Sequence, residues 1–365
     1  MSTSHGLVIG KFHPPHVGHE LLIRTAAQVS DRVTVLLLGH PTEALSIEDR
    51  TAWLQEMTAG LDNVVVAGGE DPHPIDYDDP AIWDLHEQES RSLLATVTTV
   101  PVTAVFSSEA YGDELARRFG AVHVPVDVGR DLVPVSATVI RADPVASWGH
   151  LPGPVRAGLC RRVVVVGAES TGTTTVSRAL LDVLRSRGGA HGDTRWVPEI
   201  GRAWTVEKLA AAGAHAALDG RPRPTMAELE WPTGDFVAIA RAQNVEEDRQ
   251  ARLGGPVLVC DTDAFATSIW HERYVGSPSS VVAAEARHHP LYLLTHHEGV
   301  PFEQDGIRDG EHVRTWMTER FLEALTASGR RTVVLEGSLD ERIRRAVAAV
   351  DDLLASGWTF STAGD

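Results

Sequence analysis

Three histidines and a lysine fall within ten residues near the start of the chain, in the stretch GKFHPPHVGH, residues 10–19. If a helix begins near His16, then His16 and His19 are three residues apart and share one face of its first turn. Gly18 lies between them and lets the backbone approach a ligand closely. Lys11 can aim a positive charge at the same point. Because no cysteine or carboxylate accompanies the histidines at zinc-ligand spacing, the stretch favours a phosphate site over a metal site.

A second glycine-bounded stretch, VVVVGAESTGTTT, occupies residues 163–175. It matches the phosphate-loop pattern G-x-x-x-x-G-x-[ST], with Gly167, Gly172 and Thr174 in register. Thr173 stands where this pattern normally has a lysine, so a charge that would reach the β- and γ-phosphates is absent. The backbone N–H groups and the helix dipole remain, and they still predict phosphate binding. A plain glycine-rich turn between a strand and a helix is the alternative interpretation.

Both stretches follow an apolar, β-branched run and precede a helical pattern, roughly at residues 17–29 and 173–187. Further apolar runs alternate with helical patterns, which indicates βαβ units and parallel sheets. Because ligands bind beyond the carboxyl ends of parallel strands, both stretches lie where a nucleotide would bind. The expected strands are 7–10, 33–38, 64–67, 102–107, 122–125, 163–167, 257–260, 291–295 and 332–336.

The pattern therefore predicts an α/β fold of two tandem domains, each a parallel sheet with flanking helices. Three prolines and three glycines within residues 143–158 mark the boundary between them. We expect a first domain over residues 1–145, a linker over 146–160, a second domain over 161–356 and a tail over 357–365. The acidic, proline-containing residues 68–89 show no periodicity, and they predict a long loop that is either a solvated surface or functional.

Composition narrows the class of protein. The 365 residues are 43% hydrophobic and carry a formal net charge of −17, which argues against a basic surface for nucleic acid or anionic membrane. No apolar run is long enough to span a membrane, and no basic and apolar leader opens the chain, so we expect a soluble cytoplasmic protein. Cys160 and Cys260 show no zinc or disulfide spacing and are interpreted as buried, incidental thiols.

The first stretch resembles the (H/T)xGH nucleotidyltransferase family, whose first motif runs G-x-F-x-P-x-H-x-G-H. A second family motif, (I/V)-S-x-T-x-x-R, is matched by VSATVIR, residues 135–141. The resemblance implies adenylyl transfer, in which a substrate phosphate attacks the α-phosphorus of ATP and pyrophosphate leaves. His16, His19, Lys11 and Arg141 would then neutralise the phosphate charge as catalytic groups. The implied ATP-binding residues of this domain are Gly10, Phe12, His13, Gly18, Ser136 and Thr138.

Downstream of the second stretch, VLVCDTD at 257–263 predicts a buried strand ending in two carboxylates, and FEQDGIRDGEHVR at 302–314 resembles a charged lid. The order of all these segments resembles the bifunctional NadR-type proteins, over nearly the whole chain. The resemblance implies a Rossmann-like nucleotidyltransferase joined to a P-loop kinase. It implies ATP contacts at Gly167, Glu169, Ser170, Thr171, Gly172, Thr173, Thr174, Thr175 and Arg308. It implies substrate contacts at Arg50, Trp53, Trp83, Glu109, Tyr111, Glu199, Arg202, Asp263, Gln304 and Asp305.

The expected function is NAD biosynthesis, with ATP and Mg²⁺ as cofactors and nicotinamide mononucleotide (NMN) and NAD as substrate and product. Thr174 and Asp261 would hold the magnesium, and Asp261 is also the candidate base at the 5′-hydroxyl of nicotinamide riboside. Trp83 would stack on the cationic pyridinium ring. The expected partners are small nucleotides, with a second copy of the chain as a further candidate. With the first strand starting near residue 6, we expect no DNA-binding helix-turn-helix of the kind some relatives carry.

Two alternatives stay open. The first domain could adenylylate another phosphate-bearing small molecule, such as phosphopantetheine. The second domain could be a nucleotide sensor without catalysis, an interpretation favoured by Thr173 and disfavoured by the retained DTD segment and the arginine-bearing lid.

Overall fold

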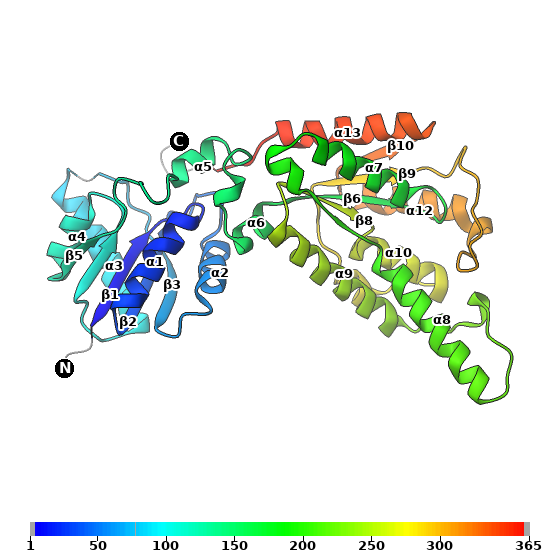
Figure 1. Cartoon of the computed structure of the whole chain (residues 1–365), viewed down its shortest axis with the longest axis horizontal. Helices are drawn as coiled ribbons and strands as arrows, with labels where there is room; N and C mark the ends of the chain where they lie inside the picture. The colour runs from blue at the N-terminus through cyan, green and yellow to red at the C-terminus, as the bar shows by residue number, and fades with distance from the viewer. Residues whose placement is uncertain (1–3, 77, 361–365) are drawn as a thin grey trace. The chain divides into compact units, whose positions relative to one another are not determined.

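The computed structural model describes residues 4–76 and 78–360. The chain forms two compact units: unit 1 comprises Met1–Leu159 and Trp358–Asp365, and unit 2 comprises Cys160–Gly357. The division after Leu159 falls inside the segment expected as a linker. Each unit is described by itself (Figure 1).

Unit 1 contains a five-stranded sheet in the order β3-β2-β1-β4-β5, with every neighbouring pair parallel. The central strand β1 aligns Val8 with Val35 of β2 and Leu7 with Val105 of β4. The strand order reverses between β1 and β4, so the loop that follows β1 opens at a topological switch point. The strands are β1 (His5–Gly10), β2 (Arg32–Gly39), β3 (Val64–Glu70), β4 (Ala104–Ser107) and β5 (Val122–Pro125).

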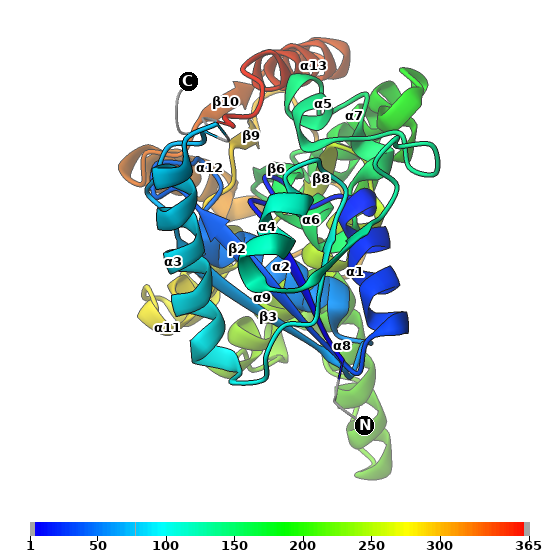
Figure 2. The same ribbon diagram turned by 90° about the vertical axis from the view of Figure 1, so that its left-hand side faces the viewer.

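Helices cover both faces of this sheet. One core packs Val8 and alternate β2 residues against α1 and α2, and the other packs Leu7 against α3 and α4. Figure 2 shows α3 and α1 on opposite sides of the strands. The helices of unit 1 are α1 (Val17–Val29), α2 (Ile47–Thr58), α3 (Pro80–Val97), α4 (Gly112–Phe119), α5 (Ala137–Ala142), α6 (Gly153–Leu159) and the short 3₁₀ helix η1 (Trp148–His150).

Unit 2 has a second five-stranded parallel sheet, in the order β10-β9-β6-β8-β7. Its central strand β6 aligns Val163 with Val259 of β8 and with Leu291 of β9. Strand β6 is followed directly by the glycine-bounded loop. The strands are β6 (Arg161–Gly167), β7 (Arg195–Val197), β8 (Val257–Asp261), β9 (Leu291–Thr295) and β10 (Thr332–Leu335).

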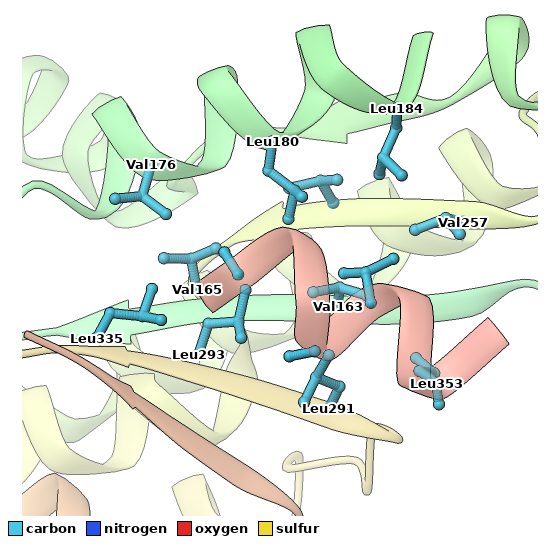
Figure 3. Packing of buried hydrophobic residues seen from close by; sticks show 14 residues of the cluster. Val163, Val165, Val176, Leu180, Leu184, Val257, Leu291, Leu293, Leu335 and Leu353 are labelled. Carbon is cyan, nitrogen blue, oxygen red and sulfur yellow. The ribbon is translucent and has the colours of Figure 1, made fainter. Parts of the chain in front are cut away.

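The core of unit 2 lies between this sheet and helices α7 and α13. Figure 3 shows Val176, Leu180 and Leu184 of α7 facing Val163 and Val165 of β6. The α-helices are α7 (Thr173–Ser186), α8 (Ile200–Leu218), α9 (Thr233–Leu253), α10 (Ala264–Val275), α11 (Ser280–Ala283), α12 (Arg314–Ala327) and α13 (Leu339–Ala355). Short 3₁₀ helices are η2 (Gly189–Asp193), η3 (Met226–Glu228) and η4 (Glu311–Val313).

The predicted α/β class with two parallel sheets is confirmed, and four local differences have physical causes. Strand β7 was missed because three residues carry no usable periodicity. Residues 68–89 are not one long loop, since β3 runs to Glu70 and α3 begins at Pro80 with the Asp79 side chain capping it. Residues 146–160 are no extended linker, because Trp148, Val155 and other apolar side chains are buried there.

The fourth difference concerns residues 358–360 of the expected tail. The Trp358 indole donates to the carbonyl of Leu159 at 2.7 Å and packs near Trp148, so these residues return to unit 1. The remaining part of the expected tail, 361–365, lies outside the described residues.

Within the part of the chain that the structure describes, no helix is long and apolar enough to cross a membrane. Cys160 and Cys260 are free, buried thiols, as expected, and burial raises the pKa of Cys160 to about 12.

Candidate active sites

The two motif histidines of unit 1 hold the start of α1 together. His16 is the N-cap residue, and its Nδ1 accepts a hydrogen bond from the Gly18 backbone N–H at 3.1 Å. The Nδ1 of His19 accepts from the His16 backbone N–H at 3.2 Å, and the two rings stack with centroids 3.7 Å apart. A Cβ on Gly18 would lie 2.9 Å from the His16 ring, which explains the glycine.

These caps fix the chemical form of both imidazoles. Because each Nδ1 accepts a hydrogen bond, each neutral ring carries its proton on Nε2 and presents that N–H as a donor. Burial lowers the pKa of His16 to about 4, and burial together with His16 lowers the pKa of His19 well below its usual value. Both rings are therefore neutral donors in the nucleotide-free site, and their expected part in neutralising phosphate charge stays a prediction.

Lys11 belongs to a buried ion-pair network that sequence reasoning missed. Its Nζ donates to Glu43 Oε1 at 3.0 Å, and Glu43 Oε2 lies 2.8 Å from Arg50 Nη2. Both Glu43 and Arg50 have fully buried side chains, and Arg50 also donates to the Lys11 carbonyl at 2.7 Å. Arg50 thus positions the loop that carries Lys11, and its expected contact with substrate stays a prediction.

The second motif contacts the first through hydrogen bonds of Arg141. Arg141 Nη1 donates to the His13 carbonyl at 2.8 Å, and its Nη2 donates to Thr138 Oγ1 at 3.3 Å. Ser136 caps α5 by accepting from Val139 N. Both ring nitrogens of His13 are buried without a hydrogen-bond partner in the described chain, and burial lowers the pKa of His13 to about 4. His13 is thus a neutral, unpaired imidazole close to the cations of this loop.

The other residues expected at this site take structural positions. Phe12, 2% exposed, lies in the core beneath His19, with the two ring centroids 4.8 Å apart. Trp83 is packed in the core on the α3 side, with the Arg118 guanidinium 5.5 Å from its ring centroid, and its stacking on pyridinium stays a prediction. Tyr111 donates to the Ile9 carbonyl at 3.1 Å.

Two further expected contacts of unit 1 are also engaged within the protein. Glu109 pairs with Arg130 at 2.6 Å. Trp53 lies against α6, since a Cβ on Gly158 would approach its ring to 2.2 Å. Arg130 is a cation that sequence reasoning missed, and its charge contributes to the low pKa of His16 and His19.

In unit 2 the loop between β6 and α7 has the backbone of a phosphate loop. Gly172 precedes the helix with φ of +89°, a conformation that favours glycine. A Cβ on Gly167 would lie 2.2 Å from Thr295 Oγ1, so β9 also requires a glycine there. Thr171 is buried behind the loop, where its hydroxyl hydrogen-bonds with that of Thr295 at 2.7 Å.

Carboxylates face this loop from the end of β8 and the start of α8. The Thr174 hydroxyl donates to Asp261 Oδ2 at 2.5 Å. Burial raises the pKa of Asp261, although hydrogen bonds from Thr174 and Thr173 oppose the rise. Burial and the nearby Asp261 charge raise the pKa of Glu199 to about 7. Oxygen ligands beside a phosphate loop are the donors that Mg²⁺ prefers.

These groups line a cavity of about 530 Å³, a size typical of small-molecule sites. Predicted residues in its wall are Gly167, Glu169, Ser170, Thr173, Thr174, Thr175, Glu199, Arg202, Asp261 and Arg308. The wall also contains a group of aromatic rings that no local sequence pattern predicted. They are Trp196, Trp231, Phe236, Trp270 and Tyr274. Trp231 and Tyr274 have ring centroids 5.3 Å apart. The cavity thus joins a phosphate loop to an aromatic end.

The predicted lid is anchored to the phosphate loop. Glu169 accepts a hydrogen bond from the Gly310 backbone N–H at 2.6 Å, and burial raises its pKa. Ser170 Oγ accepts from Glu303 N at 3.0 Å. Gln304 and Asp305 shape the turn that follows, by accepting from backbone N–H groups.

Asp263 does not reach the cavity. Its fully buried carboxylate caps α10 through Ala266 N at 2.9 Å and accepts from the Tyr292 hydroxyl at 2.8 Å. Both of its oxygens are thus engaged within the protein, and its expected contact with substrate stays a prediction.

Comparisons with known proteins agree with this arrangement. A model of the cytidylyltransferase-like family matches residues 7–143, and a model of the AAA domain matches residues 162–342. The trifunctional NAD biosynthesis/regulator proteins NadR of Salmonella typhimurium and Escherichia coli are each 25% identical over 371 residues, covering 96% of this chain and 83% of the relative.

Two solved structures share the fold over the full length. A NadR protein in complex with NR superposes with a TM-score of 0.69 at 20% identity, covering 100% of this chain and 99% of that one. A NadR protein in complex with NAD and AMP-PNP gives a TM-score of 0.66 at 20% identity and covers 99% of each chain.

A cytidylyltransferase-like unit with an H-x-G-H helix start, followed by an AAA-type unit with a phosphate loop, defines a two-domain nucleotide-handling protein of α/β class. The NadR relatives match along 96% of this chain, so the chain is similar to the NadR-type proteins over nearly its whole length.

Proposed function

We propose that the chain makes NAD from nicotinamide riboside in two ATP-dependent steps. Unit 2 phosphorylates the riboside to NMN, and unit 1 joins NMN to the AMP of a second ATP, releasing pyrophosphate. The observation that carries the proposal is the cavity of unit 2, which places an aromatic end beside a phosphate loop and a buried carboxylate. We further propose that the protein works in the cytoplasm.

In unit 2 the cationic pyridinium ring of the riboside lies at the aromatic end of the cavity, where the faces of Trp231 and Tyr274 attract positive charge. ATP lies on the N-terminal end of α7, whose backbone N–H groups and dipole favour phosphate. The 5′-hydroxyl oxygen bonds to the γ-phosphorus, the bond to the β-phosphate oxygen breaks, and ADP leaves. Asp261 accepts the hydroxyl proton or holds magnesium, and Glu199 orients the ribose.

Thr174 and Asp261 fit a magnesium ion bound together with ATP, because their oxygens meet at 2.5 Å beside the loop. The ion would neutralise charge on the β- and γ-phosphates.

In unit 1 a phosphate oxygen of NMN attacks the α-phosphorus of ATP, and the bond to pyrophosphate breaks. The Nε2–H donors of His16 and His19 bind phosphate oxygens, while Lys11 and Arg141 supply positive charge beside the same loop. The chain's own work is alignment and charge stabilisation, since this transfer needs no covalent intermediate on the protein.

A second candidate function keeps the adenylyltransferase but makes unit 2 a nucleotide sensor. Thr173, at the position of the usual phosphate-loop lysine, favours it. The buried pair of Thr174 and Asp261 and the aromatic end of the cavity favour the kinase, because a sensor of ATP alone needs neither.

One chromatographic assay separates these functions. Purified protein with Mg-ATP receives nicotinamide riboside in one tube and NMN in another. NAD in both tubes supports both steps. NAD only in the NMN tube leaves unit 1 as the adenylyltransferase and favours the sensor. No NAD in either tube, with another phosphate-bearing acceptor adenylylated instead, refutes the proposed substrate.

A further inference from the structure

The wall of the unit 2 cavity raises the question of which cation takes the place of the missing lysine. Three arginines line this cavity, Arg178, Arg202 and Arg308. A phosphoryl transfer without a permanent cation near the transferred group would lack the main charge stabilisation that such reactions use.

Two of the three arginines already face carboxylates. Arg202 Nη2 lies 2.5 Å from Asp305 Oδ2. Arg308 Nη1 lies 3.2 Å from Glu303, and its Nε lies 3.7 Å from Asp305. Both belong to the lid side of the cavity, where their charges are largely offset by these acids.

Arg178 is held differently. Within residues 4–76 and 78–360, no ion pair of its guanidinium is found, and the group lies instead 4.6 Å from the ring centroid of Trp196. The Trp196 indole is fixed in turn, because its N–H donates to Ser177 Oγ at 3.0 Å. An aromatic face orients a guanidinium without neutralising it, so Arg178 keeps its full charge for a ligand.

The position of Arg178 on α7 directs it toward the phosphate loop. It is four residues after Thr174, so both side chains lie on one face of the helix. Helical side chains lean toward the N-terminus, which brings the guanidinium back toward the loop. Thr174 contacts Asp261, and the charge of Arg178 helps to lower the Asp261 pKa against burial. Arg178 therefore lies on the same side of the cavity as Thr174 and Asp261, the two groups that the proposed function places beside the reacting phosphate.

We propose that Arg178 stabilises the negative charge of the transferred phosphoryl group. It acts from the second turn of α7, held by Trp196, and it replaces the positive charge that a lysine at position 173 would give. This inference rests on the proposed kinase function of unit 2. As the 5′-hydroxyl oxygen bonds to the γ-phosphorus and ADP leaves, the guanidinium donates to the oxygens of the group in transit. The charge is needed more in the transition state than in the bound substrate.

The test measures transfer of ³²P from [γ-³²P]ATP to nicotinamide riboside by the full chain, counting labelled NMN and NAD together. Arg178→Ala lowers kcat by about 100-fold or more and changes the KM for the riboside by less than about threefold. Arg178→Lys retains an intermediate rate. Arg249→Ala, which removes an exposed arginine of α9, is the matched control and leaves kcat unchanged. NAD formation from NMN by unit 1 stays normal in every variant, and an unchanged calorimetric transition of unit 2 reports that the varied unit is folded.

A double-variant cycle gives the sharpest readout. Thr173→Lys restores the usual cation, so it raises kcat at least tenfold in the Arg178→Ala background and much less in the wild-type background. Equal effects of Thr173→Lys in both backgrounds, or an Arg178→Ala enzyme within threefold of wild type, would overturn the inference.

The kinase proposal and this inference fail separately. If the wild-type chain forms no labelled mononucleotide while unit 1 still makes NAD, the kinase proposal is wrong. Calorimetric titration with Mg-AMP-PNP then decides the role of Arg178 in phosphate binding. Arg178→Ala weakens one class of sites by tenfold or more if Arg178 binds the γ-phosphate, and unchanged affinities reject that role.

Discussion

Glu43→Gln should destabilise unit 1 strongly, because it removes the carboxylate that pairs with both Lys11 and the buried Arg50. Glu43 and Arg50 have 0% side-chain exposure, and Lys11 donates to the other Glu43 oxygen. Burial alone would raise the pKa of Glu43, but the hydrogen bond from Lys11 and the charge of Arg50 keep that pKa below its usual value. The carboxylate is therefore ionised at neutral pH, and its loss leaves the Arg50 charge buried without a counterion.

Breaking a buried ion pair by removing one partner typically costs about 3–5 kcal/mol. For a unit of this size, 1 kcal/mol corresponds to roughly 2–4 °C in Tm, so the transition of unit 1 should fall by about 6–20 °C. The matched control is Glu20→Gln, which breaks an exposed pair with Arg24 on α1. That pair contributes about 0.3–0.5 kcal/mol, and its loss should move Tm by only about 1–2 °C.

Differential scanning calorimetry of the full chain measures both variants. Replacing the pair together, by Glu43→Leu with Arg50→Met, should recover most of the lost stability, since no buried charge then lacks a partner. A Glu43→Gln transition within 2 °C of wild type, or a double variant less stable than the single one, would show that the pair is not buried as described.

Three further changes have separate readouts. His19→Ala should lower NAD formation from NMN by about 100-fold or more, because one donor to the phosphates is lost. An unchanged calorimetric transition of unit 1 shows an intact fold, and near-normal NAD formation would contradict the assignment. Between pH 6.5 and 4 the unfolded chain protonates His16 while the folded chain, with a pKa of about 4, does not, so unfolding free energy falls as the pH falls. His16→Asn retains a capping side chain and should weaken this pH dependence in calorimetric scans at pH 4.5 and 7; parallel slopes would refute the low pKa. Thr174→Ala should raise the Mg²⁺ concentration needed for half-maximal kinase activity, whereas Ser186→Ala at the other end of α7 should not; identical magnesium titrations would remove Thr174 from the metal site.

The strands of both sheets could be predicted because a buried strand of a parallel sheet leaves a short run of adjacent apolar residues in the sequence. Central strands are buried on both faces, so they appear as continuous β-branched runs such as 163–166 in β6. Helix α3 also left a signal, since Asp79 before Pro80 is a capping residue followed by a proline at the first helical position. The acidic composition around these two residues predicted a loop, although the two residues themselves indicate the start of a helix.

The site could be predicted only where its members lie in one short motif. Glu43 lies 32 residues from Lys11, and a single acid in a loop has no pattern that marks a long-range contact. The five aromatic rings of the unit 2 cavity come from segments between 196 and 274, which only the fold brings together. Trp83 and Asp263 were chosen by residue type alone, and no sequence pattern indicated that both side chains are buried.

The geometry also changes what the H-x-G-H motif contributes. Its histidines hydrogen-bond to the backbone of their own helix start, and this fixes both Nε2–H groups as donors before any ligand arrives. Such preorganised donors cost no rearrangement during the reaction, whereas a protonated pair of rings 3.7 Å apart would repel each other. Permanent charge comes instead from Lys11 and Arg141, each held by a contact with another segment of unit 1. A chain with a net charge of −17 can therefore offer phosphate a local site, because Lys11 and Arg141 lie beside the loop and the two histidines act as neutral donors.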